Sequence, residues 1–180
     1  AGYEGQNYYS IAIGHEAGKE IQGVEGPIGG NAAQAEGAIS IGNQAGTEEQ
    51  TNRSVAIGAK AGEEKQGQDN GYYVGAGVPG EAIAIGYRAG AFHQGARAIA
   101  IGKLAGTSQS QRQDCIAIGT GAGTQNQGDA TFGIPGNAIA IGSGAGGVDQ
   151  DNRAVALGPS AAYLNQAQGG IAIGWAAAER

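Results

Sequence analysis

A short peptide, Ile-Ala-Ile-Gly or a close variant, recurs nine times in this 180-residue chain and is usually followed two residues later by Ala-Gly. The glycines that end the tetrapeptides are 28, 16, 28, 16, 17, 23, 16 and 16 residues apart, so the basic repeat is 16 residues long. A repeat of two helices needs more than about thirty residues, and the apolar residues here alternate with a period of two. Each repeat is therefore predicted to form one short strand followed by turns.

All nine copies of the motif share an aliphatic residue followed directly by a glycine, and we predict that these pairs are the structural residues of the repeat. These pairs are Ile13 and Gly14, Ile41 and Gly42, Ile57 and Gly58, Ile85 and Gly86, Ile101 and Gly102, Ile118 and Gly119, Ile141 and Gly142, Leu157 and Gly158, and Ile173 and Gly174. Glycine permits backbone bends that a side chain would forbid. Stacking the strands about 4.8 Å apart gives an all-β parallel β-solenoid of about nine coils. We expect one domain over 1–180, with longer coils at 15–37, 59–81 and 120–137.

The two faces of each strand differ in side-chain size. Both isoleucines of Ile-Ala-Ile lie on one face and the alanine on the other, because side chains alternate across the pleat. Two large aliphatic residues are all that such a coil can bury, so a single chain would be marginally stable. The flat alanine face suits close packing, either against a neighbouring chain or in the interior of the roll. We expect side-by-side association, most simply as a homotrimer.

The motif also resembles known repeats. The sequence SVAIG at 54–58, with its AIAIG and SIAIG variants, is similar to the repeats of the left-handed parallel β-roll heads of trimeric autotransporter adhesins. The IAIGxxAG pattern also looks like repeats of phage and large-virus fibre proteins. The resemblance covers nearly the whole chain, although the 16-residue unit and the insertions depart from the adhesin pattern. It implies a left-handed β-roll, trimeric assembly, adhesion or host attachment, and an extracellular location on a virion fibre or a bacterial cell surface.

Three insertions interrupt the 16-residue rhythm after Ala-Gly and before the next strand. They contain VEGPIGG from Val24, YYVGAGVPG from Tyr72 and TFGIPG from Thr131. Binding residues are often found on loops held by a rigid scaffold. We predict possible ligand-binding loops, with a host glycan or protein receptor as the partner. The predicted ligand-binding residues are Tyr72, Tyr73, Asn70, Phe132 and Asp69. The alternative is that these are ordered corner loops without a ligand. Between the insertions and strands, spacer residues such as Gln109 and Gln127 are expected to tolerate substitution.

Net charge and hydropathy exclude two classes of partner, nucleic acids and the membrane interior. The chain has 10 basic and 16 acidic residues and a net charge of −6, so nucleic acid is not expected to bind. No apolar run reaches the roughly eighteen residues of a membrane span, so this segment is not expected to insert into a membrane. The chain begins without Met, and we expect a fragment or a processed product.

No residue pattern indicates catalysis. Cys115 occupies a motif position that other copies fill with Ala, Ser or Gly, so it is interpreted as a packing residue. His15 and His93 are expected on the surface, and with one cysteine they form no zinc pattern. The acidic stretch at 149–152 lacks the recurring spacing of a calcium solenoid. No metal site and no enzymatic activity are expected.

Two matches to the dinucleotide fingerprint Gly-x-Gly-x-x-Gly occur, at 75–80 and 142–147. Neither precedes a helical pattern, so no cofactor is expected.

Three functions remain for a chain of this kind. The first is a fibre or head module that displays loops for attachment. The second is a structural filament or virion surface component without a receptor, and the third is a solenoid that faces ice or a mineral. The third needs a regular threonine array, whereas Thr47, Thr107 and Thr124 fill only three equivalent positions.

Overall fold

The computed structural model describes residues 9–22, 37–67, 80–107, 111–128 and 136–178. Within these ranges the chain forms short strands and turns, and no helix. The strands are β1 (Ile11–Ile13), β2 (Glu20–Gln22), β3 (Ile39–Ile41), β4 (Glu48–Gln50), β5 (Val55–Ile57), β6 (Ile83–Ile85), β7 (Ile99–Ile101), β8 (Ile116–Ile118), β9 (Ile139–Ile141), β10 (Val155–Leu157) and β11 (Ile171–Ile173). Nine of them are copies of the repeated tetrapeptide, as the sequence predicts.

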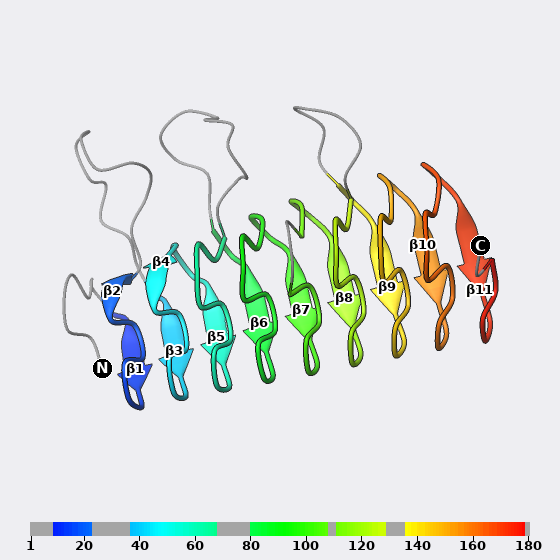
Figure 1. The fold of residues 1–180 in the computed structure, drawn as a ribbon. Helices are drawn as coiled ribbons and strands as arrows, with labels where there is room; N and C mark the ends of the chain where they lie inside the picture. The colour runs from blue at the N-terminus through cyan, green and yellow to red at the C-terminus, as the bar shows by residue number, and fades with distance from the viewer. Residues whose placement is uncertain (1–8, 23–36, 68–79, 108–110, 129–135, 179–180) are drawn as a thin grey trace.

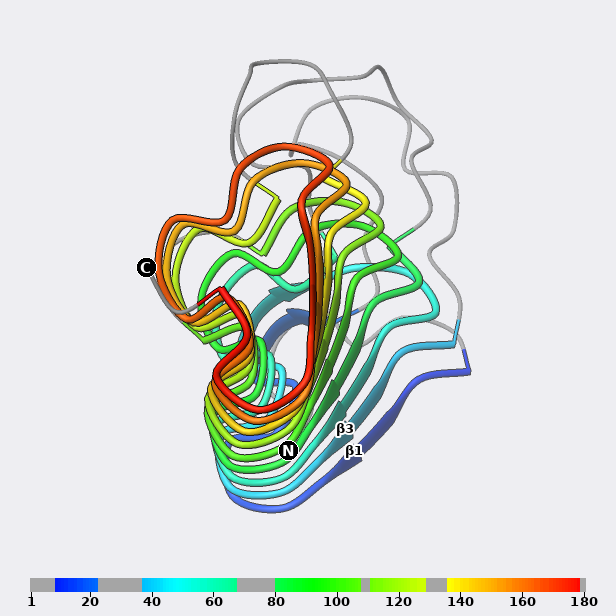
Figure 2. The same cartoon turned by 90° about the vertical axis from the view of Figure 1, so that its right-hand side faces the viewer.

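These nine strands form one parallel sheet in the order β1-β3-β5-β6-β7-β8-β9-β10-β11. Figure 1 shows them side by side in chain order from the N-terminal to the C-terminal end. Equivalent residues pair across every step, so Ile83 lies opposite Ile99 and Ala84 opposite Ala100. Viewed along the stack, the repeats follow nearly the same path behind one another (Figure 2). The arrangement is consistent with the predicted parallel β-solenoid.

The glycine after each strand is required by the distance between repeats. Gly102 has a φ of +126°, which L side chains rarely adopt. A Cβ atom added to it would lie 2.7 Å from the carbonyl oxygen of Gly119 in the next repeat. The other motif glycines up to Gly158 would meet the backbone of the following repeat in the same way. Glycine therefore provides both the bend and the close stacking.

The interior of the stack is lined by small residues. The middle residue of the strand is fully buried at Ala84, Ala100 and Ala140, and so is the alanine of each described Ala-Gly pair from Ala17 to Ala145, together with Ala161 at the equivalent position. The sequence left two places open for the alanine face, and the structure puts it in the interior of the roll. The expectation that the two large aliphatic side chains supply the buried part of each coil is wrong, because they point outward.

A second, two-stranded parallel sheet joins β2 to β4. Isolated bridges continue its direction from Glu48 to Glu64 and from Glu64 to Phe92. In Figure 1 this small sheet lies beside β1 and β3 at the N-terminal end. The described part of the chain contains no helix that is long and apolar enough to cross a membrane.

Candidate functional site

The residues that the sequence predicts as a ligand-binding set cannot be placed. Tyr72, Tyr73, Asn70, Phe132 and Asp69 all lie outside the described residues. Their role as a binding set therefore stays a prediction. The described residues instead show three features of possible functional importance: an outward apolar face, an internal column of glutamines and the corner at which insertions begin and end.

The outward apolar face of the nine-stranded sheet carries the first and third residues of each strand. We call it the isoleucine face. Its residues are Ile11, Ile13, Ile39, Ile41, Val55, Ile57, Ile83, Ile85, Ile99, Ile101, Ile116, Ile118, Ile139, Ile141, Val155, Leu157, Ile171 and Ile173. Each of them is exposed or half-buried; for example, Ile141 is 38% exposed whereas its neighbour Ala140 is 0% exposed. A continuous apolar face of this kind is typical of an association surface.

A column of buried glutamines runs through the interior, and sequence reasoning missed it. We call it the glutamine column. Its members are Gln50, Gln66, Gln94, Gln111, Gln127, Gln150 and Gln166. Six of the seven are at most 1% exposed, and Gln166 is 7% exposed. Gln127, which was expected to tolerate substitution, is a buried and hydrogen-bonded member of this column, and this burial argues against that expectation. Gln109 lies outside the described residues. The signal that could have found the column is a glutamine four residues after most Ala-Gly pairs.

Each glutamine amide closes its own repeat. Nε2 of Gln94 donates to the carbonyl oxygen of Ile83 at the start of the strand (2.8 Å) and to that of Ala98 just before the next strand (3.1 Å). Equivalent pairs of bonds occur at every member of the column. One side chain thus holds the first and last residues of its coil together.

Some of the amides also bond to one another along the stack. Nε2 donates to the Oε1 atom of the next glutamine from Gln50 to Gln66 (3.0 Å), from Gln111 to Gln127 (3.1 Å) and from Gln150 to Gln166 (3.0 Å). Polar groups buried in this way must be hydrogen-bonded to be tolerated. The column is therefore a stabilising network that small apolar residues could not replace.

The glycine of Ala-Gly makes room for the glutamine amide in most repeats, whereas Ala162 fills the equivalent position four residues before Gln166. A Cβ atom added to Gly90 would be 2.6 Å from Oε1 of Gln94, and one added to Gly146 would be 2.7 Å from Oε1 of Gln150. The Oε1 atoms of Gln94, Gln111 and Gln150 accept no hydrogen bond from the part of the chain that the structure describes. Their position over a glycine Cα atom fits a weak C–H···O contact. The Ala-Gly motif therefore marks, in most repeats, where the buried glutamine follows in the sequence.

We call the place one residue after the column glutamine of a repeat the insertion corner. Two of the inserted segments begin and end there. Gly67 and Gly80 flank one insertion, and Gly128 and Gly136 flank another. A Cβ atom added to Gly67 would be 3.0 Å from the Cα atom of Gly80, and the corresponding distance from Gly128 to Gly136 is 2.7 Å. Each of these two insertions thus leaves and re-enters the stack at adjacent glycines, at equivalent places in the repeat.

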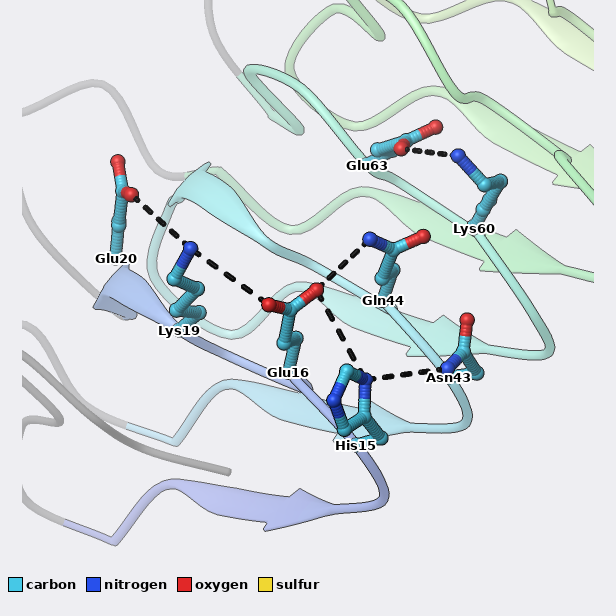
Figure 3. Close-up of polar contacts among 8 residues, drawn as sticks. All are labelled: His15, Glu16, Lys19, Glu20, Asn43, Gln44, Lys60 and Glu63. Carbon is cyan, nitrogen blue, oxygen red and sulfur yellow. Dashed lines mark hydrogen bonds and ion pairs between the residues drawn. The ribbon is translucent and has the colours of Figure 1, made fainter.

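A polar network covers the turn edge of the first repeats (Figure 3). Glu16 accepts a hydrogen bond from Nε2 of Gln44 (2.8 Å) and lies 3.8 Å from Nζ of Lys19. The bond from Gln44, with a smaller contribution from Lys19, lowers the pKa of the Glu16 carboxyl group. His15 lies beside Glu16 and Asn43 on the exposed side of this network. The predicted surface position of His15 is confirmed.

Opposite charges alternate along the residues that precede the strands. Arg53 pairs with Glu81 at 3.2 Å, and Arg97 makes a bidentate contact with Asp114 at 2.6 and 2.9 Å. Both pairs join successive repeats, so they favour the observed stacking order. Because they are partly exposed to water, each contributes little to stability.

Cys115 and the side chains that could ligate a metal ion are the remaining candidates for chemistry among the described residues. Cys115 is fully buried, and burial raises its pKa to about 12, so its thiol is protonated at neutral pH. Its Sγ atom packs beside Gly128 and Gly136, which confirms its interpretation as a packing residue. Among the residues that the structure describes, no group of three or more His, Cys, Asp or Glu side chains is placed to hold a metal ion.

Comparisons with protein-family models, with curated proteins and with solved structures give no match to this chain.

Proposed function

We propose that this chain is a non-enzymatic structural module of an extracellular fibre or adhesive head. The observation that carries this proposal is the isoleucine face, which continues along all nine strands of a rigid, regular sheet. A surface built this way suits lateral association with copies of the same chain. The small-residue interior supports the same view, because each repeat buries little apolar surface on its own.

In this proposal the repeats wind as a left-handed β-roll of about nine coils, and three chains associate side by side through their isoleucine faces. The motif resemblance to adhesin heads and viral fibre proteins supports both points. The sequence left open whether the alanine face packs against a neighbouring chain or in the interior, and this proposal does not use the alanine face for association. The isoleucine face, and not the alanine face, is available to a neighbouring chain.

The insertion corner gives the module its proposed attachment function. Two insertions leave the stack at equivalent places, so they would be displayed along one edge of the assembled fibre. We propose that they contact a host-surface glycan or protein receptor, on a virion or on a bacterial cell surface. A rigid stack suits this role, since loops on a firm scaffold lose less entropy when they bind.

The first experiment measures assembly by analytical ultracentrifugation over a range of concentrations. The parent chain is expected to sediment as a discrete trimer. Replacing Ile101 with Lys, on the isoleucine face, is expected to yield folded monomers with an unchanged circular dichroism spectrum. Growth of the parent into species without a size limit would support a structural filament instead. A parent that stays monomeric at all concentrations would contradict the association.

The second experiment tests display. Removing 68–79 and 129–135 joins Gly67 to Gly80 and Gly128 to Gly136, whose backbones are already adjacent. The trimmed chain is expected to keep its assembly state and thermal stability while it loses binding to a glycan array or to host surfaces. Equal binding by the trimmed and parent chains would move the receptor site elsewhere. A collapse in stability would show that the insertions are structural clamps.

A further inference from the structure

The backbone ladder between repeats continues in the described residues on both sides of the insertions at 68–79 and 129–135. Before the first of them, the amide of Gly67 donates to the carbonyl oxygen of Gln94 in the next repeat (2.7 Å). After it, the amide of Glu81 donates to the carbonyl oxygen of Asn52 in the previous repeat (2.9 Å). Around the second insertion, the amide of Gly128 makes the equivalent bond to Gln150 (2.7 Å), and the amides of Gly136 and Asn137 both donate to the carbonyl oxygen of Gln113 (3.1 and 3.4 Å). The added residues therefore leave the hydrogen bonding of the neighbouring repeats in place.

Coil closure is also independent of the insertion. In the repeat that carries 68–79, the amide of Val55 donates to the carbonyl oxygen of Ala82 (2.8 Å), just as that of Ile83 donates to Ala98 in the uninterrupted repeat (2.9 Å). Nε2 of Gln66 reaches the same carbonyl oxygen of Ala82 at 3.5 Å, and also that of Val55 at 2.8 Å. The glutamine thus joins the two ends of the coil beneath the inserted segment.

In a repeat without an insertion, adding residues at the corner would remove only a hydrogen bond within the turn. The amide of Ala98 donates to the carbonyl oxygen of Gly95 at 3.2 Å, and that of Ala154 donates to Asp151 at 3.3 Å. These are turn bonds within one repeat. In the insertion-bearing repeat, the amide of Ala82 donates to Oγ of Ser54 instead (3.2 Å). The stack therefore needs no continuous chain at this corner.

We propose that the insertion corner is a general insertion port, at which any repeat can carry an additional segment of variable length. The glutamine column closes the coil below the port, and a pair of adjacent glycines forms its narrow neck. This inference rests on the proposed display function, because the port would carry the segments that such a function needs. It extends that function from the natural insertions to repeats that now have none, such as the one containing Gly95 and Ala96.

The experiment grafts a twelve-residue segment, six histidines flanked by Gly-Ser-Gly on each side, between Gly95 and Ala96. Ala96 is changed to Gly in the same variant to form the neck. The native graft is expected to bind nickel-chelate resin and to unfold cooperatively, with a melting temperature lowered by only about 5 °C or less. A second graft, between Asp151 and Asn152 with D151G and N152G to form the glycine pair, is expected to behave in the same way.

The matched control places the same segment between Gly102 and Lys103, where the motif glycine stacks directly on Gly119. This graft is expected to lose cooperative unfolding. Failure of both corner grafts to fold, or equal tolerance of all three sites, would overturn the port. These outcomes are separate from receptor binding by the parent chain, whose absence would contradict the display function and not the port.

A further variant tests whether the glutamine is the closing element. Gln94→Ala is made in the parent and in the Gly95 graft. The melting temperature is expected to fall further in the graft, because the parent still has the turn bond from Ala98 to Gly95. An equal fall in both backgrounds would show that the glutamine does not close the port and would overturn that part of the proposal.

Discussion

The interior of the stack and the isoleucine face are built from the same three-residue strands, yet they follow opposite rules. The interior holds alanine and glutamine, while the larger and more apolar isoleucine is left half-exposed outside. Ala100 is 0% exposed between Ile99 and Ile101, which both remain accessible. Burial in this coil therefore does not follow hydrophobicity: the strand places only small residues such as alanine inside, and the one large interior side chain is a glutamine whose amide is hydrogen-bonded. The interior stabilises the repeat through close packing and hydrogen bonds, and the apolar surface remains available for association.

The largest expected difference in stability is between two single variants that place a carboxylate on opposite faces of the same strand. Ala100→Glu buries an unpaired carboxylate in the filled interior and is expected to cost more than about 4 kcal/mol in the free energy of unfolding. Ile101→Glu, its matched neighbour on the isoleucine face, is expected to cost less than about 1.5 kcal/mol under conditions where both chains are monomeric. Chemical denaturation followed by circular dichroism measures both. Similar losses for the two variants would break the comparison.

The next effect concerns the glycines that set the distance between repeats. Gly102→Ala forces a Cβ atom against Gly119 and is expected to cost about 3 kcal/mol. Gly174 has a similar φ of +119°, but no atom of the described residues lies within 4 Å of its added Cβ, so Gly174→Ala is expected to cost only about 1 kcal/mol. The difference between the two free energies of unfolding isolates the contact between repeats. Equal costs would show that backbone conformation alone requires glycine.

The glutamine column provides a test of the hydrogen bonds inside. Gln127→Ala leaves the carbonyl oxygens of Ile116 and Ala138 without their side-chain donor and is expected to cost about 2 kcal/mol. Gln125→Ala is the control, because Gln125 is exposed and lies in the same repeat; its cost is expected to be below about 0.5 kcal/mol. Thermal and chemical unfolding measure the difference. A silent Gln127→Ala would restore the view that this residue is only a spacer.

The smallest effect lies on the outer surface, where stacked carboxylates repel one another. Partial burial, together with Glu64 and Glu20 in the neighbouring repeats, raises the pKa of Glu48 above its usual value. The folded chain therefore holds this proton more tightly than the unfolded chain, so stability falls as the pH rises through the raised pKa. The parent should lose stability relative to Glu48→Gln as the pH is raised across this acidic range. A pH-independent difference between the two chains would contradict this effect.

The repeat and its strands are predictable from local sequence alone. The spacing of the motif glycines predicts a 16-residue repeat, the alternation of Ile and Ala predicts one strand in each copy, and the structure confirms nine such strands in register. These features follow from local rules: a strand alternates its side chains, and glycine permits a bend. Equivalent residues such as Ala84 and Ala100 then align because each repeat presents the same pattern to the next.

Which face of the strand lies inside depends on how the closed coil packs. Both faces of Ile-Ala-Ile are apolar, so hydropathy could not separate them, and the choice depends on the width of a coil closed in three dimensions. The same holds for Gln127, whose polar side chain is typical of a surface spacer until the coil folds over it. Its burial is stabilised by the carbonyl oxygens of Ile116 and Ala138, which are eleven residues away in either direction. Contacts at that separation exist only once the chain has closed on itself.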